Sequence, residues 1–314
     1  RLHSTGRQVS ICFSEGTQMI SELAIDASGF PHSFGDDQIQ LHQIPTNAAI
    51  VFQSPAIASI EETRAIARSH GWIFVIPLAS RTSYGYVYND QISREEDVRA
   101  DFSRFLQQEQ VPADQQVRAL RFPSFVRVCL FDGALFRIGN AASFMEPLEA
   151  TAIAITLEQL RLASLWLADG FPGAVGDQKW EPDFLDLFNR HLTRTVQAVA
   201  LFVSWHYACG SAYDTQFWRF ARANFADAVS RHGETTLLAE FERYVHAGAA
   251  VPNDHLGRLR DAEFYENEIK PVLGLTGEVG GFGVPSFAQV GRGIGAYADP
   301  EISGEQTYQN GERK

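Results

Sequence analysis

Hydrophobic and polar residues alternate along much of the first half of the chain. Alternation of this kind is typical of strands whose two faces lie in different environments. It predicts strands over residues 9–13, 23–29, 38–44, 48–52, 64–70, 72–78, 84–88 and 126–138. Turn residues at Gly71 and at positions 80–83 separate three of these strands, so residues 64–88 should form a meander.

Apolar residues follow a spacing of three and four in the second half, which favours helices. These helices are expected over residues 147–167, 182–208 and 234–246, together with one that Asp214 caps. Residues 147–167 are apolar around the whole circumference, so this helix should be buried. It should end at residues 169–173, and the glycine-rich tail from Gly274 is expected to pack as loops.

One helix is expected inside the strand-rich half. Ser93 and Glu96 have the spacing of a capping box, and Val98, Phe102 and Leu106 follow as an apolar stripe. Mixed sheets followed by helices are typical of a two-part enzyme of the α/β (α+β mixed) class.

The composition argues against several kinds of partner. The chain of 314 residues has a net charge of −12, whereas nucleic acids and anionic membranes favour a basic face. It has no uncharged apolar run of about 18 residues, so we expect no membrane span. Cys12, Cys129 and Cys209 cannot all pair with one another, which favours a reducing, cytoplasmic location. The spacing of His, Asp and Glu indicates no metal site.

Residues 139–152 combine several features of a ligand-binding turn. Gly139 follows a predicted strand, and the absence of a Cβ lets its backbone approach a ligand closely. Pro147 suits the first turn of a helix, where unpaired N–H groups attract anions. Glu149 projects from the same turn and is a candidate for chemistry. The alternative is that its charge only stabilises the positive end of the helix, by about 0.3–1 kcal/mol.

Four segments give the chain a resemblance to the flavin-dependent halogenases of the tryptophan halogenase family, and more loosely to other flavin monooxygenases. They are residues 27–30, residues 71–88 with the run Trp-x-Phe-x-Ile-Pro, residues 139–152 and residues 206–218. The resemblance implies a flavin-monooxygenase-like, FAD-binding fold. Residues 1–170 would then be the remainder of the flavin-binding domain, and residues 171–314 a helical substrate-pocket region.

The resemblance also implies a function. Members of this family use reduced FAD, supplied by a separate flavin reductase, with oxygen and chloride or bromide. The hypohalous acid that they make halogenates an electron-rich, indole-like substrate. Glu149 matches the catalytic glutamate. The positions that match the other roles are Gly139, Asn140, Ala141, Ala142 and Pro147 for the flavin, Thr151 and Ala152 for the halide, and Trp72, Phe74, Ile76 and Pro77 for the substrate or its tunnel. A homodimer is a further expectation.

The chain departs from the family pattern in three ways. Phe74 replaces the second Trp of the family signature, which leaves more room at that wall. Ala150 and Ala152 replace the Ser and Gly on either side of the threonine. The family's N-terminal third, with its glycine-rich nucleotide site and catalytic lysine, has no counterpart, since no lysine precedes Lys179. We therefore interpret the chain as the C-terminal two-thirds of a halogenase, and expect it alone to bind FAD weakly and to be inactive.

Other interpretations stay open at this point. The chain could belong to a flavin-dependent monooxygenase that hydroxylates, or be a non-catalytic remnant without a flavin site. Trp72 and Phe74 could be plain core residues. His206 and Tyr207 lie on an apolar helix, where such residues are more often core groups than ligands.

Overall fold

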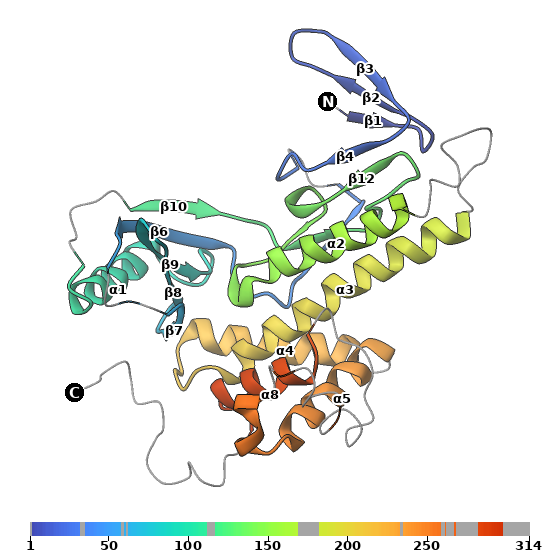
Figure 1. Cartoon of the computed structure of the whole chain (residues 1–314). Helices are drawn as coiled ribbons and strands as arrows, with labels where there is room; N and C mark the ends of the chain where they lie inside the picture. Colours follow the sequence, from blue (N-terminus) through green and yellow to red (C-terminus); the bar gives the residue numbers. More distant parts are fainter. Residues whose placement is uncertain are drawn as a thin grey trace. The chain divides into compact units, whose positions relative to one another are not determined.

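A computed structural model describes residues 2–31, 35–57, 60, 62–111, 117–168, 182–232, 235–258, 261, 267 and 282–297 (Figure 1). The chain divides into two compact units, each made of two separate stretches. The first unit comprises Arg1–Leu41 and Pro123–Ala200, and the second comprises His42–Phe122 and Leu201–Lys314. The functional division expected near residue 170 stays a prediction, because compactness does not tell which region binds flavin or substrate.

Three small sheets lie among the described residues of the first unit. Strands β1 (Leu2–Ser4), β2 (Val9–Cys12) and β3 (Gln18–Ser21) form an antiparallel meander. Strand β4 (Ala24–Asp26) pairs in parallel with β12 (Leu135–Arg137). The third sheet has the order β13 (Ser143–Phe144), β11 (Phe125–Arg127), β5 (Gln38–Gln40). The long strand expected over residues 126–138 is therefore wrong, since β11 and β12 lie in different sheets.

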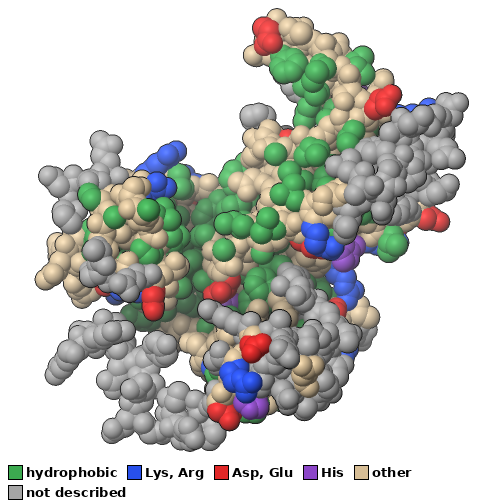
Figure 2. All heavy atoms as spheres, in the orientation of Figure 1, with side chains coloured by type: hydrophobic (Ala, Val, Ile, Leu, Met, Phe, Trp, Pro, Cys, Tyr) green, Lys and Arg blue, Asp and Glu red, His purple; other side chains and the backbone are tan. Residues whose placement is uncertain are grey.

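Helix α2 (Thr151–Ala168) follows these sheets and is less buried than its composition indicates. Ile153 and Leu157 are 64% and 60% exposed, and Figure 2 shows hydrophobic side chains at the surface over this helix. The expectation of a helix buried on all sides is thus wrong. Over residues 151–164, whose side chains are described, the buried residues form one stripe at a spacing of four that begins with Thr151 and Ile155. Residues 169–173, expected to end the helix, lie outside the described residues.

A five-stranded antiparallel sheet forms the first half of the second unit. Its order is β10 (Arg118–Arg121), β6 (Ala48–Pro55), β9 (Arg81–Tyr88), β8 (Gly71–Pro77), β7 (Arg64–Arg68). The meander expected over residues 64–88 is confirmed, and its register pairs Trp72 with Val87 and Phe74 with Gly85.

Helix α1 (Glu95–Gln108) packs against this sheet in a core that includes Ile73, Val75, Tyr86 and Phe102. The helix has Arg94 as its N-cap residue and no side-chain cap hydrogen bond. The capping box expected at Ser93 is therefore wrong. The backbone N–H of Ser93 donates to the carbonyl of Asn89, so this residue belongs to the preceding turn.

The described helical elements from residue 182 onward are α3 (Pro182–Cys209), α4 (Gln216–His232), α5 (Thr236–Ala250), a 3-10 turn over Asn253–Arg258, and α8 (Val284–Gly293). The helix α3 agrees closely with its prediction. Helix α8 contradicts the expectation that the tail packs as loops. Its glycines do not break it, because Val284, Phe287 and Ala288 are buried and the helix packs on α5.

The mixed α/β class expected from the sequence is confirmed. In the described part of the chain, no helix has both the length and the apolar character that a membrane crossing needs. None of the three cysteines forms a disulfide.

Candidate functional site

The predicted flavin, halide and catalytic residues all lie in the first unit. The flavin residues and Glu149 lie on the connection between β12 and α2, and the halide residues Thr151 and Ala152 open α2. Gly139 follows β12 with a φ of +57° and opens a 3-10 turn, Gly139–Ala141. Left-handed backbone of this kind favours glycine. A second 3-10 turn, Leu148–Ala150, comes immediately before α2.

The backbone is left-handed again at the candidate catalytic residue. Glu149 has φ 56° and ψ 22°, and Ala150 has a φ of 52°. Each such conformation costs about 1–3 kcal/mol for a residue with a Cβ, and it persists only where the surroundings enforce it. The pair breaks the expected continuity with the helix, which begins at Thr151 and not at Pro147. The Glu149 residue is exposed.

The first turn of α2 starts from a buried residue. Thr151 is fully buried, and its hydroxyl donates to the carbonyl of Glu146 at 3.2 Å. Glu146 is itself fully buried. Ala152, the position of the family's glycine, is not among the described residues with positive φ, so alanine is unstrained there. The N–H groups of the first turn of α2 form the positive end of the helix dipole, where anions are favoured.

The turn at Gly139 is fixed from two sides. The N–H of Gly139 donates to the side-chain carbonyl of Gln159 at 2.8 Å. The Arg127 guanidinium donates to the carbonyl of Ala141 at 2.8 Å, and the Arg127 N–H donates to the carbonyl of Ala142. Ala141 and Ala142 are buried, whereas Gly139 and Asn140 are half-buried.

Gln159 was not predicted from the sequence. Its signal is a single amide on the inward stripe of α2, between Ile155 and Ala163. That signal is visible only once the inward face of α2 is known.

The predicted tunnel residues lie in the second unit, on strand β8. Ile73 and Val75 face α1 in the core, so Trp72, Phe74 and Ile76 lie on the opposite face of the strand. Phe74 and Ile76 are half-buried, as is the adjacent Pro77. The ring of Phe74 lies over Gly85, where any Cβ would come within 2.1 Å of it. Phe74 therefore covers a glycine on the face away from α1.

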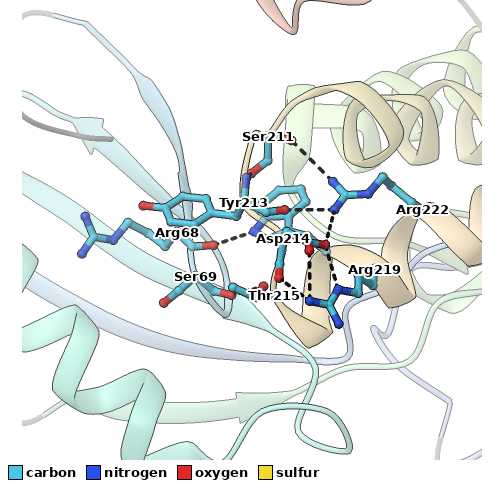
Figure 3. A network of polar contacts seen from close by, with 9 residues as sticks. Arg68, Ser69, Ser211, Tyr213, Asp214, Thr215, Arg219 and Arg222 are labelled. Carbon is cyan, nitrogen blue, oxygen red and sulfur yellow. Dashed lines mark hydrogen bonds and ion pairs between the residues drawn. The ribbon is translucent and has the colours of Figure 1, made fainter. Parts of the chain in front are cut away.

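Within the second unit, hydrogen bonds connect two of the four segments that carry the family resemblance, residues 71–88 and 206–218. The indole N–H of Trp72 donates to the hydroxyl of Tyr207 at 2.7 Å. The indole N–H of Trp218 donates to the carbonyl of Arg68, and the Thr215 hydroxyl donates to the carbonyl of Ser69 (Figure 3). These bonds fasten the β7–β8 hairpin to the corner between α3 and α4. Tyr207 and Trp218 are thus buried structural groups with defined partners.

Asp214 does not cap α4, contrary to the sequence-based expectation. Its carboxylate pairs with Arg219 at 2.7 Å and with Arg222 at 3.7 Å (Figure 3). The helix begins at Gln216, and Thr215 directs its hydroxyl to Ser69. The neighbouring His206 is buried, and its Nδ1 lies 2.8 Å from the carbonyl of Phe202.

A buried ion pair supports the same hairpin from α1. Arg68 contacts both oxygens of Asp101, at 3.1 and 2.6 Å, and the Tyr86 hydroxyl donates to Asp101 at 2.9 Å. Burial alone would raise the pKa of Asp101, but the hydrogen bond and charge of Arg68 outweigh it and hold the pKa below its usual value. Burial, with the Asp101 charge, raises the pKa of Tyr86. Among the described residues, no three His, Cys, Asp or Glu side chains gather as a metal site would require.

Comparison with known proteins identifies the family. The family model described as tryptophan halogenase matches residues 1–248. The chain belongs to the tryptophan halogenase family. It is 27% identical over 251 residues to the tryptophan 7-halogenase KtzQ of Kutzneria sp. (strain 744), covering 74% of this chain and 44% of that protein. It is 29% identical over 157 residues to the tryptophan 7-halogenase RebH of Lentzea aerocolonigenes, covering 50% of this chain and 28% of that protein.

Solved structures of other halogenases share the fold. BrvH, a flavin-dependent halogenase from Brevundimonas sp. BAL3, superposes with a TM-score of 0.65 at 22% identity, over 96% of this chain and 55% of BrvH. MibH, a tryptophan 5-halogenase, gives a TM-score of 0.66 at 20% identity, over 95% of this chain and 53% of MibH. The chain thus has the fold of a flavin-dependent halogenase and spans about half the length of these relatives.

Proposed function

We propose that this chain is part of a flavin-dependent halogenase that uses reduced FAD, oxygen and chloride or bromide to halogenate an indole-like substrate. The observation that carries the proposal is the presentation of Glu149. Its carboxylate belongs to an exposed residue, two consecutive left-handed residues define its backbone, and the first turn of α2 follows directly. Membership of the tryptophan halogenase family supports the same activity.

In this proposal the flavin contacts the turn that begins at Gly139. Bound reduced FAD would supply two of the four electrons that reduce oxygen, and the halide, which is oxidised to hypohalous acid, would supply the other two. Gly139 and Asn140 are half-buried and Pro147 is exposed, so these three can contact the cofactor. The buried Ala141 and Ala142 would support the turn from beneath. We assign the cofactor contact to Gly139, Asn140 and Pro147.

Thr151, Ala152 and Glu149 divide the remaining work in this proposal. The N–H groups of Thr151 and Ala152 would bind the halide at the positive end of α2. When halogen replaces hydrogen on an aromatic carbon, the ring loses a proton. The carboxylate of Glu149 would accept that proton and keep the substrate oriented.

The substitution Glu149→Gln tests this assignment. In the full-length protein we expect halogenated product to fall about 10²- to 10⁴-fold, the usual loss for one acid–base group. Reoxidation of reduced flavin, measured as hydrogen peroxide, should change little. Glu158→Gln is the matched control, because Glu158 lies on α2 and pairs with Arg161. Equal loss of product and peroxide would contradict the role, and a hydroxylated product would indicate a monooxygenase.

The substrate is proposed from the face of β8 that carries Trp72 and Phe74. Phenylalanine at position 74 leaves more room than tryptophan, so we expect indole and larger arenes to react and free tryptophan to be a poor substrate. Phe74→Trp should lower turnover of the larger arenes by restoring the bulk. Product analysis with tryptophan, indole and phenols measures this. Regioselective conversion of free tryptophan, with little activity on indole, would refute it.

A separate flavin reductase and a homodimer complete the proposal. Halogenation should require either an added reductase or chemically reduced FAD, and fail with oxidised FAD alone. Sedimentation at several protein concentrations measures the oligomeric state.

A further inference from the structure

The inward face of α2 contains one polar side chain that the proposed mechanism does not use. Thr151, Ile155, Gln159 and Ala163 recur at a spacing of four, and all are buried. Gln159 is only 1% exposed. Burial of an amide is unfavourable unless its donors and acceptors are hydrogen-bonded. A buried glutamine between Ile155 and Ala163 therefore needs partners.

Those partners lie at the two ends of the turn that precedes α2. The side-chain oxygen of Gln159 accepts the N–H of Gly139 at 2.8 Å, although the residues are 20 positions apart. Its side-chain nitrogen lies 3.5 Å from the hydroxyl of Ser143, which is also buried. The short contact to Gly139 is the strong one, since 3.5 Å is at the limit of a hydrogen bond.

We propose that Gln159 is a positioning residue for the flavin-contacting turn, an inference that rests on the proposed function. Its amide holds the turn from Gly139 to Ser143 against α2, and the first turn of α2 starts two residues after Glu149. One side chain thereby connects the flavin-contacting turn with the helix that begins directly after Glu149 and Ala150. A displacement of the turn would change both the affinity for flavin and the delivery of halogen.

The contact also restricts how the turn can bind flavin. The N–H of Gly139 already donates to Gln159, so it is engaged within the protein. Glycine is still required at this position because its φ is +57°. The carbonyl of Gly139 likewise accepts the N–H of Ala142 at 2.9 Å. The flavin contact then falls on the Cα of Gly139 and on Asn140.

The substitution Gln159→Leu in the full-length protein removes the acceptor and keeps the volume. Hydrogen exchange by mass spectrometry should show faster exchange in a peptide covering residues 138–144, and not in the β7–β8 hairpin. The FAD dissociation constant should rise about tenfold, a typical consequence of losing one buried hydrogen bond. The ratio of halogenated product to hydrogen peroxide should also fall, which a general loss of stability would not produce.

Two further variants keep the test decisive. Gln159→Glu retains an acceptor for the Gly139 N–H. It should restore most of the protection of residues 138–144 from hydrogen exchange and most of the ratio of halogenated product to hydrogen peroxide. Gln159→Asn shortens the side chain by one methylene, which moves the acceptor away from Gly139. This variant replaces Gln159→Leu in the test if the leucine variant does not fold. Glu158→Gln, one position away on α2, should leave all three readouts unchanged.

The results separate this inference from the proposed function. Unchanged exchange, FAD affinity and product-to-peroxide ratio in both Gln159→Leu and Gln159→Asn would overturn the positioning role. A wild-type protein that binds FAD but makes no halogenated product would overturn the proposed function. In that case, a faster exchange of residues 138–144 in the variant would still support the contact between Gln159 and the turn.

Discussion

The β7–β8 hairpin and the 139–152 segment hold the two sets of candidate site residues, and they are built in opposite ways. The hairpin is regular antiparallel sheet. The carbonyls of Arg68 and Ser69 accept side-chain hydrogen bonds from Trp218 on α4 and from Thr215 just before it. The 139–152 segment has two 3-10 turns and left-handed residues at Gly139, Glu149 and Ala150. The hairpin is fixed by many cooperating hydrogen bonds. In the 139–152 segment, by contrast, the irregular backbone leaves Glu149 exposed.

The comparison predicts its largest effect at the ion pair beneath the hairpin. Asp101→Ala should lower the free energy of unfolding by about 3–5 kcal/mol, because it leaves a buried charge on Arg68 without its partner. The side chains of Arg68 and Asp101 are 12% and 5% exposed. Denaturant titration measures the loss. The control is Glu96→Ala, whose ion pair with Arg94 is exposed and should contribute about 0–1 kcal/mol. Similar losses in both variants would contradict the importance given to burial.

The same pair predicts a pH dependence. Because the pKa of Asp101 is lowered in the folded state, its contribution to stability is present above the unfolded pKa of about 3.9. It is lost as the pH falls through the folded value. Wild type should therefore lose stability on acidification below about pH 4 more steeply than Asp101→Asn. Urea unfolding at a series of pH values checks this, and parallel curves would show that Asp101 does not titrate as described.

A smaller effect is expected where α3 meets the hairpin. Tyr207→Phe removes the acceptor for the Trp72 indole N–H, and an unsatisfied buried donor costs about 1–3 kcal/mol. Thermal unfolding measures the loss, and tryptophan fluorescence should shift as Trp72 changes environment. Tyr88→Phe is the control, since it removes a hydroxyl from the α1 side of the same sheet. An unaltered spectrum in Tyr207→Phe would mean that this bond does not orient Trp72.

The smallest effect has the opposite sign and lies in the irregular segment. Ala150→Gly should stabilise the protein by about 1 kcal/mol, because glycine tolerates the left-handed conformation. Halogenation should fall, since the backbone beside Glu149 becomes less restricted. Ala154→Gly, in the interior of α2, should instead destabilise by about 0.5–1 kcal/mol. A loss of stability in Ala150→Gly would show that the left-handed residue is not strained.

Periodicity predicted most elements, and its failures have physical causes. The meander from β7 to β9 and the helix α3 match their predictions because long periodic runs favour one structure. The capping box at Ser93 was wrong, since the residue is used by a turn to Asn89. The tail was expected to form loops from its glycine content, but packing of α8 on α5 outweighs the low helix propensity of glycine.

The candidate site was predicted as a set of positions and not as an arrangement. The motif predicted a catalytic role for Glu149 and a flavin contact at Gly139, and both stay predictions. It gave no sign that both Glu149 and Ala150 are left-handed, because alanine and glutamate rarely adopt that backbone by themselves. The apolar composition of α2 wrongly predicted burial on all sides, since Ile153 and Leu157 face outward in this structure.

The sequence alone determined the class of fold, the order of most strands and helices, and the family, since each depends on local periodicity or on short motifs. Only the tertiary structure decided which side chains meet. Trp72 reaches Tyr207 across 135 positions, and Gln159 reaches Gly139 across 20. Hydrogen bonds between distant residues depend on how the chain folds back on itself. The sequence around one residue of each pair does not indicate which residue will be its partner. For that reason the roles of Gln159 and Tyr207 could be read from the fold and not from the pattern.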